Sequence, residues 1–161
     1  MKLALYKYHR PGWGTHALFD RLARLVKGKW VNWRFKPGRY SHSEIVINGL
    51  CYSSSFRDGG VRSKEIDLTD GHWDVVDVGG NDADALMWFA MHEGQKYDWP
   101  ALGRFVFGHW WPQVTAWWFC SEACVCMLDL GEVVGFNLLS MAYAADCHPC
   151  DLAEIVGLEP R

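Results

Sequence analysis

The 161-residue chain has no excess of positive charge. Its 16 lysine and arginine residues stand against 19 aspartate and glutamate residues, and the formal net charge is −3. Proteins that bind nucleic acid without sequence preference need a basic face to displace counterions. The balance of charge therefore argues against a nucleic-acid partner. Internal repeats, low-complexity tracts and linkers are also lacking, so we expect residues 1–161 to form a single domain.

Long apolar runs are missing as well. A membrane-spanning helix needs about 20 predominantly apolar residues, and the N-terminal apolar run is far too short for a secretory signal peptide. We therefore expect no integral membrane segment, a cytoplasmic location and reduced thiols on the six cysteines. The most apolar stretch, residues 110–130, is interrupted by Pro112, Gln113, Cys120, Glu122 and Asp129.

Strand-like patterns precede helical ones, which predicts an α+β fold rather than a doubly wound parallel sheet. Half of the residues are apolar and ten are tryptophan, enough for an ordinary core. The predicted strands are 2–8, 41–47, 50–56, 61–66 and 73–78. The predicted helices begin at Thr15, at Asn81 or Asp82, near Pro100 and at Cys120, with a short one in the tail.

Apolar spacing gives two of these helices a defined face. The first helix carries Leu18, Leu22 and Leu25 on one side. The second helix ends at Gly94, and the residues near one of its faces are Leu86, Phe89, Ala90 and Glu93.

Asn48-Gly49 joins the runs SHSEIVI and LCYSSSF, which predicts a hairpin with a two-residue type I′ turn. Counting outward from the turn pairs Ile45 with Tyr52. Side chains alternate between the two faces of a strand. The residues predicted to share one face are His42, Glu44, Val46, Cys51, Ser53 and Ser55.

Cys120 stands at a predicted helix start, in the segment WWFCSEACVCMLDLG. Free N–H groups and the positive end of the helix dipole favour a thiolate there and can hold an oxyanion. Ser121 and Glu122 follow at the same end, where we expect substrate to bind. The alternative is a core cysteine, which is the interpretation we favour for Cys51, Cys124 and Cys126, while Ala123, Cys124, Met127 and Leu130 form an apolar stripe.

His42 is the favoured base among the seven histidines, because Glu44 or Ser53 on the same face could fix its ring. The alternative is an ordinary buried strand histidine. Only His148 follows Cys120, and it lies in a proline-containing turn without a strand pattern. The CxxC pair Cys147 and Cys150 lacks a thioredoxin-like frame and further metal ligands, so we expect no cofactor and no metal.

Three segments, in order, resemble the YiiX-like branch of the NlpC/P60 superfamily, the circularly permuted papain-like hydrolases. The segments are YSHSEIVINGLCYSSS, GQKYDWPAL and FCSEACV. The resemblance implies that Cys120 is the nucleophile, that His42 is the general base and that Tyr97 lines the site. Permuted bacterial members usually carry an acid at the position of Ser53, and Glu44 could compensate for its replacement.

The resemblance implies a small antiparallel sheet packed against helices and hydrolysis of an amide bond through a thioester on Cys120. The expected substrate is a peptide, a peptidoglycan fragment or an isopeptide. A lipid acyltransferase or thioesterase acting on a lipid-like amide or ester is one alternative, and a degenerate binding module of phage or prophage origin is another. The basic, aromatic run at residues 29–39 is a solvated loop or a contact for an anionic substrate or lipid headgroup.

Overall fold

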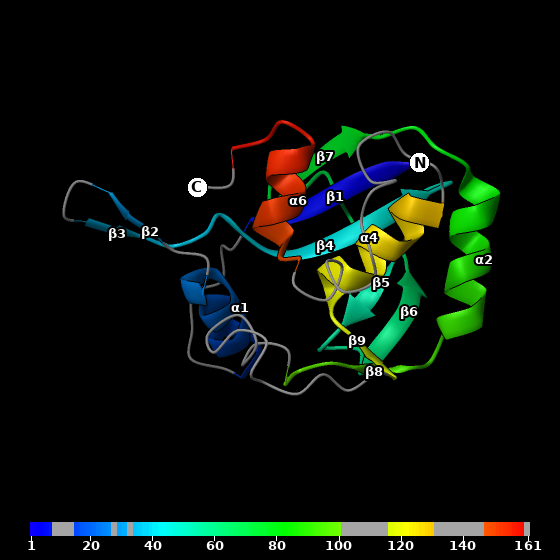
Figure 1. Ribbon diagram of the computed structural model, residues 1–161, viewed down its shortest axis with the longest axis horizontal. Coiled ribbons are helices and arrows are strands. Elements are labelled where there is room, and N and C mark those ends of the chain that lie inside the picture. The colour runs from blue at the N-terminus through cyan, green and yellow to red at the C-terminus, as the bar shows by residue number, and fades with distance from the viewer. Residues whose placement is uncertain (8–14, 27–28, 32–33, 101–115, 131–146, 160–161) are drawn as a thin grey trace.

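A seven-stranded mixed sheet forms the centre of the computed structural model, which describes residues 1–7, 15–26, 29–31, 34–100, 116–130 and 147–159 (Figure 1). The strand order is β7-β1-β4-β5-β6-β8-β9, and only β8 and β9 run parallel. The predicted α+β class is confirmed. The strands are β1 (Lys2–Lys7), β4 (Tyr40–Ile47), β5 (Leu50–Ser55), β6 (Gly60–Lys64), β7 (Trp73–Asp77), β8 (Lys96–Tyr97) and β9 (Trp117–Trp118), with a separate ribbon of β2 (Lys29–Val31) and β3 (Arg34–Lys36).

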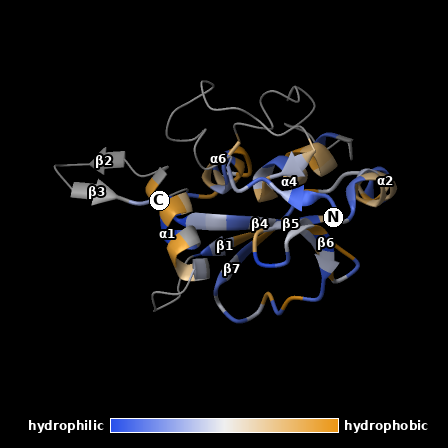
Figure 2. Cartoon of the chain, turned by 90° about the horizontal axis from the view of Figure 1, so that it is seen from below, coloured by the Kyte–Doolittle hydropathy of each residue, from blue (hydrophilic) through white to orange (hydrophobic). Residues whose placement is uncertain are grey.

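Helices cover one side of this sheet, with α4 in the middle (Figure 2). The described helices are α1 (Thr15–Val26), α2 (Asp82–His92), α4 (Cys120–Leu130) and α6 (Pro149–Ile155). In the part of the chain that the structure describes, none of them has the length and apolar character to cross a membrane. The helix predicted near Pro100 falls at 101–115, outside the described residues.

Helix α4 is buried on every side. It packs against β4 and β5 as well as against α2 and α6, so no face is left for water. The predicted stripe of Ala123, Cys124 and Met127 is buried, but so are all the other side chains of residues 120–128. The helix is therefore a central core element whose first residue is fixed by the burial of residues 120–128.

The predicted hairpin between β4 and β5 is confirmed. Ile45 pairs with Tyr52 and Ile47 with Leu50. Both turn residues have positive φ, 51° for Asn48 and 84° for Gly49, as a type I′ turn requires.

A β-bulge in β4 lies directly before His42. Tyr6 of β1 pairs with His42, but Lys7 pairs with Tyr40, so Ser41 is an extra residue on β4. Bulges bend a strand and redirect the side chains next to them. The irregularity thus sets the direction in which His42 leaves the sheet.

The residues expected near one face of α2 are only partly buried: Phe89 belongs to the core and Leu86 packs against it. Asn81 caps the helix, as expected, by accepting a hydrogen bond from the N–H of Ala83 at 3.0 Å. The face turned inward, however, carries Ala85, Trp88 and Phe89, while Ala90 is exposed. Trp88 packs edge-on against Trp118 of β9 with 5.0 Å between ring centroids. This contact joins α2 to a segment that lies far from it in the sequence.

Strand β6 begins at Gly60, where it passes close to the residue before β8. A Cβ atom on Gly60 would lie 1.9 Å from the carbonyl oxygen of Gln95, which accepts the N–H of Val61 at 2.8 Å. Gly60→Ala is therefore expected to lower the free energy of unfolding by at least about 3 kcal/mol in urea titrations.

Gly59→Ala is the matched control. Gly59 has a φ of +87° but nothing within 4 Å of a built Cβ. The substitution introduces only backbone strain of about 1 kcal/mol. If Gly60→Ala and Gly59→Ala lowered the free energy of unfolding equally, the close contact between Gly60 and the Gln95 carbonyl would be contradicted.

Candidate active site

Cys120 is the first residue of α4, as the sequence predicts. The first intrahelical bond runs from the N–H of Ala123 to the carbonyl of Phe119, and the carboxylate of Glu122 accepts the N–H of Phe119 at 3.3 Å. The N–H groups of Cys120 and Ser121 precede that first bond and point out of the helix end. The Cys120 side chain itself is fully buried.

Two side chains hydrogen-bond the sulfur of Cys120. One is the imidazole of His42 on β4, and the other is the phenol of Tyr97 on β8. The Nε2 atom of His42 lies 2.7 Å from Oε1 of Glu44. Glu44 thus contacts one ring nitrogen of His42, while the ring also interacts with the sulfur. The predicted pairing of a cysteine at a helix start with a strand histidine is thus present in the structure.

Charge around His42 favours its protonated ring. Burial by itself would lower the pKa of His42, but the negative charges of Cys120 and Glu44, together with hydrogen bonds to both, raise this pKa to about 9. The ring therefore carries a proton at neutral pH. An imidazolium stands between a sulfur and a carboxylate.

Arg62 on β6 holds the carboxylate of Glu44 in place. Its Nη1 atom donates to Oε2 at 2.7 Å and its Nη2 atom to Oε1 at 2.6 Å, a bidentate pair. Burial would raise the pKa of Glu44, but the hydrogen bonds from Arg62 and the charge of His42 lower it below its ordinary value of 4.5. Glu44 therefore stays ionised although its side chain is fully buried.

The ionic chain continues beyond Arg62 to the surface. The Nε atom of Arg62 donates to Asp58 at 2.9 Å, and Nζ of Lys64 donates to the same carboxylate at 3.0 Å. Burial opposes the ionised form of Asp58, yet these two cations hold its pKa far below the usual value. His42, Glu44, Arg62, Asp58 and Lys64 thus alternate in charge from the sulfur outward.

Ser53 does not orient His42. Its hydroxyl donates to the carbonyl of Ser43 at 2.7 Å, and Glu44 is the group bonded to the imidazole. Ser53 lies opposite Arg62 in the ladder between β5 and β6. Because the serine side chain is small, it leaves room for Arg62 to reach across β5 to Glu44.

The side chains of Ser121 and Glu122, which we expected at the substrate site, fix the start of α4. Both are buried. The Ser121 hydroxyl donates to the carbonyl of Cys147, and the Glu122 carboxylate caps the start of α4. These side chains fix the helix end, which leaves only backbone groups of this segment for contact with a ligand.

A cleft of about 600 Å³ opens on the far side of His42 and Tyr97. Both side chains line the cleft and also bond the sulfur of Cys120, which has no exposed surface. Rings of Phe56 and Phe119 pack against Tyr97, with centroids 5.8 Å and 5.4 Å away. The imidazole and the phenol therefore separate the sulfur from the cleft.

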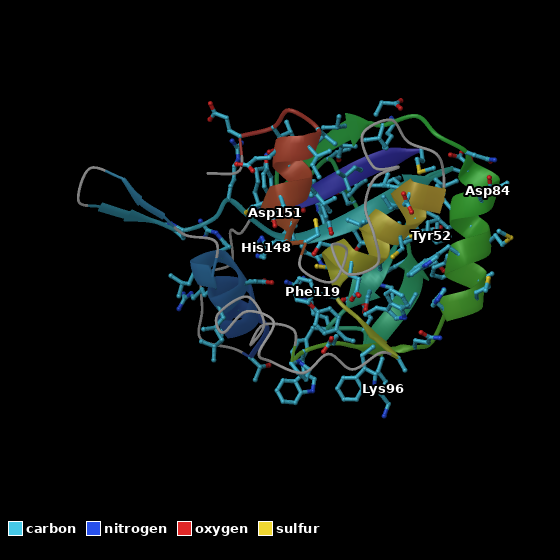
Figure 3. The ribbon with its side chains drawn as sticks, viewed as in Figure 1. Tyr52, Asp84, Lys96, Phe119, His148 and Asp151 are labelled. Carbon is cyan, nitrogen blue, oxygen red and sulfur yellow. The ribbon has the colours of Figure 1, made fainter. Side chains whose placement is uncertain are left out.

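His148 has a structural position. It caps α6, where its Nδ1 accepts the N–H of Cys150 at 3.1 Å and its own N–H donates to Asp151 at 2.8 Å (Figure 3). Its Nε2 lies 2.9 Å from the carbonyl oxygen of Ala23 in α1. Cys147 and Cys150 are buried thiols that donate to the carbonyls of His148 and Tyr40. Within the described part of the chain, no group of three or more His, Cys, Asp or Glu residues could hold a metal ion.

Comparison of the chain with protein-family models, with curated proteins and with solved structures gave no match. The geometry of the site therefore carries the functional argument by itself. The main residue that the sequence did not single out is Arg62. Its signal was a charged residue facing Ser53 across the next pair of strands, on the face shared with Glu44.

Arg62→Met is expected to lower the free energy of unfolding by about 3–5 kcal/mol, because it leaves the buried Glu44 carboxylate without its cation. The folded-state pKa of Glu44 lies below its ordinary value of 4.5, so the stabilisation is complete above that pH and is lost as the pH falls through the folded pKa. Urea titrations should thus show a difference in the free energy of unfolding between wild type and Arg62→Met, and this difference should become smaller at acidic pH.

Lys64→Met is the matched control. Lys64 belongs to the same chain of charges but is more than half exposed and contacts Asp58 rather than Glu44. Its loss should cost at most about 1 kcal/mol. If Arg62→Met and Lys64→Met lowered the free energy of unfolding by similar amounts, the bidentate pair of Arg62 with Glu44 would stabilise the protein no more than an exposed ion pair.

Proposed function

We propose that the protein is a cysteine hydrolase that cleaves an amide bond through a Cys120 thioester, with His42 as its acid and base. The observation that carries this proposal is the placement of His42 between the Cys120 sulfur and the Glu44 carboxylate. Enzymes commonly activate a nucleophile with a base that a third group orients. In the proposal these three groups are Cys120, His42 and Glu44. An imidazolium beside a thiol stabilises the thiolate, which is the reactive form.

In the proposed reaction, the Tyr97 ring moves aside to admit the amide from the cleft, and the thiolate of Cys120 attacks its carbonyl carbon. The negative charge that develops on the carbonyl oxygen is held by N–H groups at the start of α4. His42 donates its proton to the leaving amine, and the carbon–nitrogen bond breaks to leave a thioester. His42 then takes a proton from water, the resulting hydroxide attacks the thioester, and the acid product leaves with the thiolate restored.

Glu44 is the proposed orienting group. Its hydrogen bond to Nε2 fixes the His42 ring and stabilises the imidazolium. Arg62 acts through Glu44 as a positioning residue, because it keeps the carboxylate ionised and fixes the direction of Oε1.

The fold is compatible with membership of the permuted NlpC/P60 branch, which we include in the proposal. A histidine strand precedes the cysteine helix along the chain, and that helix packs against the sheet. Permuted bacterial members usually carry an acid at the position of Ser53 to orient the histidine. In this chain Glu44, on the neighbouring strand, would take over that role. A cleft of about 600 Å³ lies in the range of sites for small ligands or short peptide segments.

Alkylation of Cys120 by iodoacetamide across pH tests the proposed pair. Wild type is expected to react faster than His42→Ala near neutral pH, because an imidazolium beside a sulfur favours the reactive thiolate. The two reaction rates should converge at alkaline pH, where thiols in general are ionised. Mass spectrometry of the modified peptide shows that the measured rate belongs to Cys120. Cys124→Ala, which removes another cysteine of the same helix, should leave that rate unchanged. Coincident profiles for wild type and His42→Ala would leave a degenerate binding module as the better account.

Tyr97 should control the size of reagent that reaches the sulfur. Removing its ring in Tyr97→Ala opens the path from the cleft, so labelling by a bulky maleimide should accelerate by about tenfold or more relative to iodoacetamide. Tyr97→Phe keeps the ring and loses only the hydroxyl, so it should not show this change in size selectivity. An unchanged ratio of the two labelling rates in Tyr97→Ala would show that the cleft is not the route.

A further inference from the structure

Helix α1 turns its leucines away from the protein. Leu18, Leu22 and Leu25 share one face, as their spacing predicts, and are 50%, 44% and 50% exposed. The opposite face, which packs toward β4, carries the small or charged residues Ala17, Asp20 and Ala23, all of them buried. A helix on the surface of a globular protein normally has the reverse arrangement.

Polar contacts fix this orientation of α1. Asp20 accepts a hydrogen bond from Arg57 at 2.6 Å on the inner side, and the carbonyl of Ala23 lies 2.9 Å from Nε2 of the buried His148. Rotating the helix to bury its leucines would break both contacts and leave the buried Asp20 carboxylate without its cation. The outward leucines are therefore a consequence of the packing of the rest of the chain.

The same part of the chain concentrates positive charge. Residues 15–40 hold seven of the 16 lysine and arginine residues but only one of the 19 aspartate and glutamate residues. Arg21 falls on the leucine side of α1, three residues after Leu18 and four before Leu25. Residues 15–40 thus carry a formal charge of +6 (7 − 1), while the rest of the chain carries −9 (9 − 18).

Helix α1 and the ribbon of β2 and β3 lie at the same end of the molecule, and the ribbon extends away from the body there (Figure 1). Trp30 pairs with Phe35 across the ribbon, and Lys29 pairs with Lys36. Helix α1 lies at this end of the molecule and contains apolar residues (Figure 2). Apolar and basic residues are thus combined on one projecting part of the fold.

We infer that the leucine face of α1 docks on an anionic membrane surface, with the helix lying in the plane of the lipid headgroups. Leucines on one face with flanking arginine and lysine are the features that hold interfacial helices at such surfaces. A second copy of the chain fits less well, because a symmetric contact would bring two basic ends together. Asp20 on the same helix lines the cleft, so docking would bring the cleft close to the bilayer.

Co-sedimentation of the full chain with vesicles tests the docking surface without any assay of hydrolysis. Binding is expected to vesicles of mixed phosphatidylglycerol and phosphatidylcholine, to be much weaker with phosphatidylcholine alone, and to fall as salt screens the charges. Replacing all three leucines by glutamine in Leu18→Gln, Leu22→Gln and Leu25→Gln should weaken binding by about tenfold or more.

Met87→Gln with Met91→Gln is the matched control. These side chains of α2 are 54% and 70% exposed, on a helix that begins with two aspartates. The methionine variant should bind as wild type does. Undiminished binding by the leucine variant, or equal binding to both kinds of vesicle, would overturn the inference. So would light scattering that shows a dimer abolished by the leucine changes when no vesicle binding occurs.

Discussion

The carboxylate of Glu44 is shared between the imidazole of His42 and the guanidinium of Arg62, and the geometry of the candidate site follows from this shared contact. A fully buried carboxylate is stable only when its charge is matched and its oxygens are hydrogen-bonded. Arg62 does both through a bidentate pair, while His42 takes the remaining direction at 2.7 Å. The orientation of the His42 ring is therefore fixed by its contact with a carboxylate that Arg62 already holds in place.

Three strands and one helix cooperate in this arrangement. Strand β4 supplies His42 and Glu44, and the bulge at Ser41 redirects the strand just before them. Strand β5 contributes a small residue, Ser53, over which Arg62 reaches from β6. Residues 120–128 of helix α4 are all buried, so its first residue has little freedom to move. An acid at position 53 would compete with Arg62 for the same space, which offers a physical reason why Glu44 and Ser53 occur together.

The features that the sequence predicted correctly are local. The Asn48-Gly49 turn specifies its own geometry, and alternation then sets the faces of both strands. The start of α4 at Cys120 follows from nearby pattern alone. Arg62 was missed because its contact with Glu44 crosses an intervening strand. The inward position of Trp88 on α2 and the outward leucines of α1 were missed for a related reason: they involve contacts with a tryptophan of β9 and an arginine beyond β5, and local periodicity contains neither.

An account in which charge holds the site together is tested most directly by NMR titration of the His42 ring in wild type and in Cys120→Ala. The contacts with Cys120 and Glu44 predict that the wild-type ring keeps its proton until about pH 9. In the variant the sulfur is gone, so the ring should lose its proton at a lower pH. A wild-type His42 that titrates near the ordinary value of 6.5, or a curve that is unchanged by the loss of the sulfur, would contradict the account.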